Sequence, residues 1–321
     1  MAIRVAAVPE PSNLLMLWST PEEVSAMSTL GMMQVLFLAL AVVMAGLGLS
    51  LELADFRRLL NEKRAVVVAL VLQMIILPLA AFALATAMSL STPYAVGLML
   101  LAAAPGSISS NLYSHVFGGN VALNVSLTGI NTVLSMVTLP LICSWSIVHF
   151  AAGPETMPEV GGKLIETMAT LIVPVIIGMV VRARAPRFAE RVNKPMRLVS
   201  VIVLVVFSAA AIVKEWEALA LAFTQVGVSV ILFNLLSMVV GYRASLAMAL
   251  DQASAVAVTF QLGVRSAVLS IYVAMTALNN AQIALPAAVY SITMVLLGLS
   301  FGVWVKRRAS AQSRNGALVK A

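Results

Sequence analysis

The chain has 321 residues, of which 61% are hydrophobic and only 10% are charged. Soluble domains carry about 25% charged residues, so this composition excludes a soluble protein and indicates one embedded in the lipid bilayer. The net charge of +7 comes from basic residues in predicted loops, which excludes a nucleic-acid-binding face. One Cys and two separated His provide neither a disulfide nor a metal-binding motif.

Apolar runs of about 20 residues predict membrane-spanning helices, because the strands of a membrane barrel would alternate over about 10 residues. Residues 1–28 are too polar to span and are predicted to form a non-spanning N-terminal tail. A transmembrane domain follows over 29–305, and residues 306–321 form a basic tail. About nine helices are predicted in this domain, at 29–50, 64–88, 93–114, 121–148, 163–182, 196–213, 222–242, 252–277 and 283–305.

The basic residues are distributed unequally between the two sides of the predicted membrane. With an external N-terminus, 16 Lys and Arg residues lie in cytoplasmic segments and three lie outside. Cytoplasmic loops of membrane proteins carry this kind of excess. The sequence therefore predicts an odd number of spans, an external N-terminus and a cytoplasmic C-terminus, in a cell membrane of the bacterial inner-membrane type.

Polar residues interrupt the apolar sequence over residues 102–135. Pro105 and Gly106 come part-way through a predicted span, where a proline removes a backbone donor and breaks or kinks the helix. The next helix carries polar residues at the spacing i, i+4, i+7 and i+11, which is one helix face. The face carries Asn124, Thr128, Asn131 and Ser135, and it either bonds neighbouring helices or forms an ion site together with Ser110 and Asn111 after the break.

A second polar interruption, over residues 259–266, contains Arg265 about 12 residues from either end of its span. An arginine at that depth costs at least roughly 2.5–3.5 kcal/mol unless another group compensates its charge. All 13 Asp and Glu residues lie in loops, tails or span ends, so no carboxylate is available at that depth. Either an organic anion compensates Arg265, or backbone carbonyls and Gln261 bind it in a structural role. Gln73, a lone amide in the second span, fits either interhelical bonding or a ligand site.

The two interruptions fall in the second-to-last span of each half of the domain. Corresponding breaks in two halves predict inverted repeats with a binding site near the middle of the membrane. The repeats are expected over about 29–150 and 160–305. The first half has one span fewer than the second, as if it had lost an initial helix.

Three segments carry a resemblance to the bile acid:sodium symporter family of secondary transporters. They are GLGLSLELADFRRLL after the first span, APGSISSNLYSHVFGGNVALNVSLT at the first break and VTFQLGVRSAVLS at the second. The resemblance covers about residues 30–305 and implies an all-α fold of two inverted repeats, with two crossing broken helices and with panel and core domains. It places spans 1, 5 and 6 in the panel and spans 2–4 and 7–9 in the core.

The same resemblance assigns sodium-site positions, some of which are substituted here. The matching positions are Ser110, Asn111 and Thr128, with Gln73 at the second site and Gln261 between the two, and Asn124 stands where the family often has Ser. The family has Glu where this chain has Gln261, and Gln where it has Arg265. The site is therefore less attractive to cations by two charge units, and we expect Arg265 to take the place of the second sodium, with coupling weakened or lost.

The sequence thus predicts a secondary or facilitative transporter of a small organic anion, with sodium as the candidate coupling ion and no other cofactor. Arg265, Gln261, Asn111 and Asn131 are the predicted substrate-binding residues. An efflux carrier of the same superfold, of arsenite or auxin type, and a transport-silent sensor or binding protein are the alternatives. An enzyme is not expected, because no Ser-His-Asp arrangement lies at membrane depth, and no obligate protein partner is evident.

Overall fold

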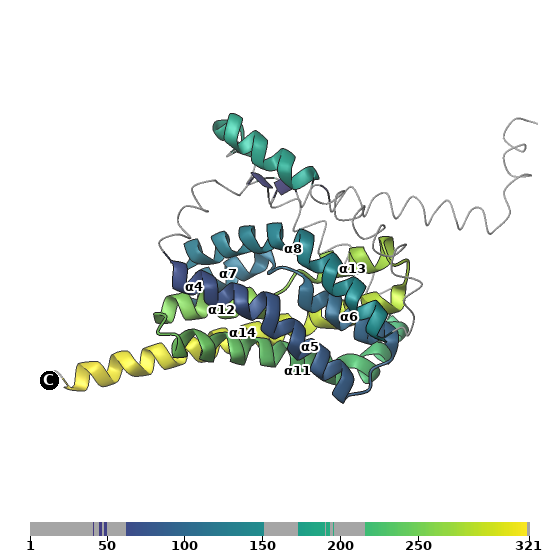
Figure 1. Cartoon of the computed structure of the whole chain (residues 1–321). Coiled ribbons are helices and arrows are strands. Elements are labelled where there is room, and N and C mark those ends of the chain that lie inside the picture. The colour runs from purple at the N-terminus through teal and green to yellow at the C-terminus, as the bar shows by residue number, and fades with distance from the viewer. Residues whose placement is uncertain are drawn as a thin grey trace, which may run out of the picture.

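The computed structural model describes residues 62–150, 173–189 and 216–319, together with isolated positions over 41–49 and 191–195. Every named element in these ranges is helical, as predicted (Figure 1). The tail 1–28, the predicted span 196–213, the first half of 163–182 and all but isolated positions of 29–50 lie outside the described residues. The helices are α4 (Lys63–Val71), η1 (Leu72–Ile76), α5 (Leu77–Ala87), α6 (Thr92–Ala103), α7 (Ile108–Phe117), α8 (Val121–Phe150), α11 (Trp216–Ala247), α12 (Gln252–Gly263), α13 (Ala267–Thr276) and α14 (Ala281–Val319).

Long apolar helices frame the described bundle. Three of them are long and apolar enough to cross a membrane, over Lys63–Ala87, Ala220–Ala247 and Ala281–Arg308, and the bent α8 makes a fourth. Their outer faces carry exposed aliphatic side chains, such as Val67, Leu79 and Leu296, which suit contact with lipid. Helix α14 continues through the predicted basic tail and projects beyond the other helices (Figure 1).

Both predicted interruptions are true breaks between two short helices. The first break separates α6 from α7 at residues 104–107, and the second separates α12 from α13 at residues 264–266. Helices α12 and α14 each begin 160 positions after α6 and α8, respectively. The turns before the two broken helices also match, with positive φ at Ser89 (47°) and Ala249 (56°). These equivalences are the structural signature of a repeat.

Two local distortions in the long helices have causes in the sequence. Pro78 cannot donate a backbone hydrogen bond to the preceding turn, and the wide π turn η1 lies directly before it. In α8, the segments Val121–Ser135 and Val137–Phe150 meet at 52°. Pro140 lies four residues after Met136, and a proline ring clashes with the carbonyl four residues before it, so Pro140 accounts for the bend.

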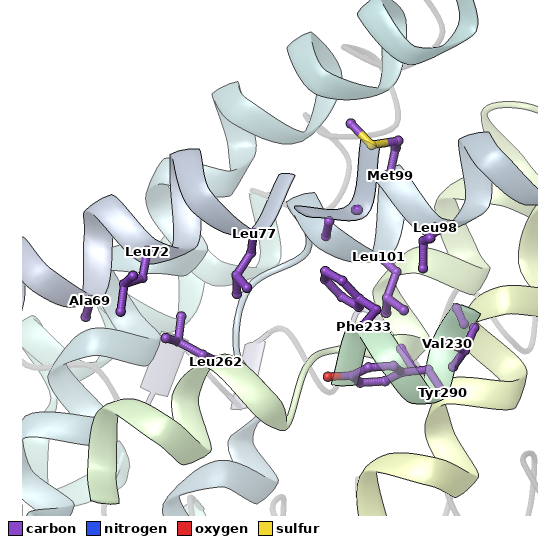
Figure 2. Packing of buried hydrophobic residues seen from close by; sticks show 14 of the residues in the cluster. Ala69, Leu72, Leu77, Leu98, Met99, Leu101, Val230, Phe233, Leu262 and Tyr290 are labelled. Carbon is purple, nitrogen blue, oxygen red and sulfur yellow. The ribbon is translucent and has the colours of Figure 1, made fainter. Parts of the chain in front are cut away.

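The main hydrophobic core joins helices from both halves of the chain. Figure 2 shows Leu98 and Leu101 of α6 beside Val230 and Phe233 of α11, with Tyr290 of α14 next to them. All of these side chains are buried. Because α14 packs against both α6 and α11, and α11 packs against α12, this core holds the first break next to the second.

Replacing Gly97 by alanine is expected to destabilise this packing. A Cβ at Gly97 would lie 2.3 Å from the carbonyl oxygen of Ile283 and 2.8 Å from Cγ of Pro286. Overpacking of this kind costs about 1–3 kcal/mol, so the thermal midpoint in detergent should fall. Gly227→Ala is the matched control, because the nearest atom there is the ring edge of Phe223 at 3.0 Å. Equal midpoints for the two variants would contradict the prediction.

Candidate functional site

The two breaks cross and pair with each other through their backbones. Gly106 and Arg265 form an antiparallel bridge. The Ser107 N–H donates to Val264 O at 2.8 Å, and the Ser266 N–H donates to Pro105 O at 2.9 Å. Backbone that leaves a helix at membrane depth needs such partners, because no water satisfies it there. The antiparallel pairing means that α6 and α12 approach the crossing from opposite directions.

Arg265 is completely buried at this crossing and donates to the carbonyl end of α6. Its Nη1 lies 2.7 Å from both Ala102 O and Ala104 O, and 3.3 Å from Leu101 O. Its Nε donates to Leu262 O at 3.1 Å. Cations are favoured at helix carboxyl ends because the free carbonyls carry partial negative charge. The guanidinium thus links the two halves of the chain through their broken helices.

Gln73 completes this set of oxygens around Arg265. It lies within the π turn η1, is 1% exposed, and accepts from Arg265 Nη2 at 3.1 Å through Oε1. Its Nε2 donates to Ala104 O at 2.9 Å. The Phe233 ring centroid lies 5.7 Å from Arg265 Cζ, within range of a cation–π contact. The lone amide of the second span is therefore part of the crossing.

A second polar cluster surrounds Gln261 of α12. Gln261 Oε1 lies 3.1 Å from Ser110 Oγ and 3.0 Å from Thr128 Oγ1. Asn124 Nδ2 donates to Ser110 O at 2.9 Å and also to Ser114 Oγ. All five of these side chains are at most 2% exposed. The structure thus brings together four of the predicted sodium-site residues.

Two amide side chains, one in this cluster and one on the same face of α8, have buried atoms without a hydrogen-bond partner. Gln261 Nε2 is buried without an acceptor, and the Gln261 side chain lies against Gly106, where a Cβ would come within 2.3 Å of Nε2. Both amide atoms of Asn131 are buried and unpaired. Asn111 is the most exposed member of the cluster at 8%, and its Oδ1 lies 3.5 Å from Thr128 Oγ1. Unpaired buried amides are costly, so these groups are candidates to meet a ligand.

Comparison with known proteins assigns the family. The family model described as "Sodium Bile acid symporter family" matches residues 37–222, more than half of the chain. The chain belongs to this family. Its members are membrane transporters and not enzymes, in agreement with the prediction from the sequence.

Three relatives illustrate the breadth of the family. The "Uncharacterized sodium-dependent transporter YocS" of Bacillus subtilis (strain 168) is 30% identical over 285 residues, which cover 87% of each protein. The "Probable sodium/metabolite cotransporter BASS2, chloroplastic" of Oryza sativa subsp. japonica is 29% identical over 269 residues, covering 84% of this chain and 63% of the rice protein. The "Ileal sodium/bile acid cotransporter" of Cricetulus griseus is 28% identical over 184 residues, covering 57% of this chain and 53% of the hamster protein.

The charges of the described residues leave Arg265 without a carboxylate partner. The acidic residues in this part of the chain lie at helix ends: Glu62 before α4, Glu217 in the first turn of α11 and Asp251 at the N-cap of α12. Asp251 Oδ2 accepts from the Ala253 and Ser254 N–H groups, so this carboxylate caps the amino end of α12. The positive charge at the crossing therefore faces neutral oxygens.

Three residues in this region were not predicted from the sequence. Tyr290 donates its hydroxyl to Gly263 O at 2.8 Å and so satisfies the carbonyl end of α12. Phe233 lies beneath Arg265, and the neighbouring Asn234 is fully buried with both amide atoms unpaired. Asn234 is an amide near the middle of an apolar span, a signal similar to the one that marked Gln73. The two aromatic residues carry no comparable signal, because aromatic residues are common in any apolar span.

Proposed function

We propose that this family member transports small monovalent organic anions without a requirement for sodium. The observation that carries the proposal is the position of the Arg265 guanidinium among the Leu101, Ala102 and Ala104 carbonyls and the Gln73 amide oxygen. Carbonyl and amide oxygens are the ligands that hard cations prefer. A tethered cation already uses them here, so a second sodium does not fit this site.

The cluster around Gln261 is a second reason to expect that sodium binds only weakly. Sodium sites gain affinity from carboxylates, and this position holds a neutral amide in place of the carboxylate that the family resemblance leads one to expect. The Ser110 and Thr128 hydroxyls each have one proton and another acceptor in reach, Asn124 Oδ1 at 3.2 Å and Asn124 O at 2.9 Å. A half-turn of the Gln261 amide would let Nε2 donate to both hydroxyls. Neutral groups therefore satisfy one another without an ion.

The preference for anions follows from the uncompensated charge of Arg265. Helices α7 and α13 both begin at the crossing, with Ser107 and Ser266 at their N-caps, and their positive dipole ends add to this charge. Carbonyl oxygens already accept the hydrogen bonds of the guanidinium. We therefore propose that Arg265 attracts the substrate through its electric field and not by direct contact. Gln261, Asn111 and the unpaired amide of Asn131 are the proposed contact residues. The substrate would lie between the core and the panel, as the family resemblance implies.

The proposed orientation agrees with the charges of the bundle. Six basic residues lie at the end of the bundle that contains the turns at 118–120 and 248–251: Lys63, Arg64, Arg243, Lys306, Arg307 and Arg308. The backbone hydrogen bond from Asn120 to Ala253 O and the contact of Lys306 with the Phe117 ring hold these segments together. This end would face the cytoplasm, with the N-terminus outside.

Transport in proteoliposomes tests the proposal. Uptake of radiolabelled pyruvate, lactate, glycolate and taurocholate should be nearly the same when choline replaces sodium in the external medium. Counterflow of the same anions separates transport from the binding alone that a sensor would show. Uptake that rises steeply with sodium concentration would contradict the proposal, and so would the absence of flux with every anion.

A further inference from the structure

Arg265 differs from a bound sodium in one respect that affects the transport cycle, since it cannot dissociate. From this we infer that the protein is predominantly an exchanger of monovalent organic anions and that its net, one-way transport is slow. The inference rests on the proposed function and extends it to the mode of transport. It depends on the buried charge of Arg265 and on the absence of a carboxylate around it in the described part of the chain.

The described contacts of Arg265 reduce its charge only in part. Its hydrogen-bond partners are the carbonyls of Leu101, Ala102, Ala104 and Leu262 and the Gln73 amide, and all of them are neutral. The carboxyl ends of α6 and α12 each supply roughly half an elementary negative charge, and the amino ends of α7 and α13, which begin at the same crossing, supply about the same amount of positive charge, so the guanidinium remains largely uncompensated. The Phe233 ring adds a cation–π contact but no negative charge. The empty crossing thus keeps a net positive charge.

The substrate then decides the charge of the moving site. With a monovalent anion bound, the site is close to neutral, and it is positive when empty. When access changes from one side to the other, the site passes through a closed state from which water is excluded, and there a bare charge is most costly. The empty carrier should therefore return slowly, whereas a carrier loaded with a second anion returns readily.

The same charge assignment predicts a dependence on membrane potential. Exchange of one monovalent anion for another moves no net charge across the membrane. One-way transport moves one negative charge per cycle, and a membrane potential acts on each charge that crosses. A potential should therefore change the rate of one-way transport and leave the rate of exchange unchanged.

Proteoliposomes that contain the full chain test this inference with the same four labelled anions. The medium contains sulfate and no chloride, because chloride is itself a monovalent anion. Efflux of the labelled anion is measured with and without the same unlabelled anion outside. External anion should accelerate efflux about tenfold or more. A potassium diffusion potential set with valinomycin should change only the efflux without external anion.

Gln73→Glu is the decisive variant, because it adds a counter-charge without removing Arg265. The Gln73 Oε1 lies 3.1 Å from Arg265 Nη2, so a glutamate there places a carboxylate next to the guanidinium. The ratio of the efflux rate with external anion to the rate without it should fall toward one, and the affinity for anions should weaken. Gln282→Glu is the matched control, because it makes the same chemical change at an exposed residue next to Asn280. This control should behave like the unmodified protein.

Each result has a distinct meaning. Sodium-independent efflux that is equally fast with and without external anion would overturn the exchange mode and leave the proposed function in place. A folded Gln73→Glu variant, with unchanged thermal midpoint and unchanged acceleration, would also overturn it. Flux that requires sodium in both modes would contradict the proposed function itself.

Discussion

Arg265→Ala is expected to reduce strongly the stabilisation of the purified protein by organic anions. The substitution removes the buried positive charge, which at a separation on the order of 8 Å and an effective dielectric near 20 contributes about 2 kcal/mol to anion binding. That energy corresponds to roughly a thirtyfold loss of affinity. The measurement is the shift in thermal midpoint produced by each anion of the panel, for the variant and the unmodified protein.

The same substitution should also lower the stability of the fold. It leaves Ala102 O and the Gln73 Oε1 without their Arg265 donor at a site with no access to water. Leaving a buried acceptor unsatisfied costs about 1–3 kcal/mol. Arg265→Lys is the matched control, because it keeps the charge and loses the planar arrangement of donors. It should lose stability and retain a response to anions, whereas unchanged anion affinity in Arg265→Ala would contradict the role of this charge.

The double variant Gln261→Glu/Arg265→Gln is expected to gain a response to sodium. It restores one negative charge and removes one positive charge, a change of two units at short range. A ligand at a hundredfold excess over its Kd stabilises the folded state by about 2.7 kcal/mol. The thermal midpoint of the double variant should therefore rise in sodium chloride relative to choline chloride, and that of the unmodified protein should stay constant.

The single substitutions serve as controls for the double variant. Gln261→Glu alone places a carboxylate near the crossing while Arg265 still acts as a cation, so it should respond weakly to sodium. Arg265→Gln alone removes the tethered cation and supplies no carboxylate. A sodium response in the unmodified protein as large as that in the double variant would show that Gln261 and Arg265 do not exclude the ion.

Much of the crossing could be predicted from the chain because its signals are local. Pro105 and Gly106 predict the first break, since a proline cannot continue the hydrogen bonds of a helix at membrane depth. The helical period places Asn124 and Thr128 on one face, and both are buried as predicted. Hydropathy alone locates Arg265 far from both ends of its span. The family resemblance, confirmed by the comparisons, assigned the positions around it.

The partners of Arg265 could not be read from the sequence. Backbone carbonyls carry no sequence signal, and the carbonyls that lie free at the crossing depend on how α6 and α12 meet. The second break also begins later than the polar interruption suggests, because the Thr259 hydroxyl bonds Ala255 O within α12. The tertiary contacts resemble those of the structural alternative, with backbone carbonyls around the guanidinium but with Gln73 in place of Gln261. An effect of Arg265 on the substrate through its electric field stays a proposal.

The bond between Arg265 and Ala104 also constrains how the protein is made. Its two residues are 161 positions apart in the chain. At a synthesis rate of about 5–20 residues per second, the carbonyls at the end of α6 wait roughly 8–30 seconds for their donor. During that interval the first half of the protein holds an unfinished polar backbone within the membrane. The first half therefore obtains the donor for these carbonyls only when the second half has been made. A chain truncated before Arg265 should remain a substrate for membrane quality control.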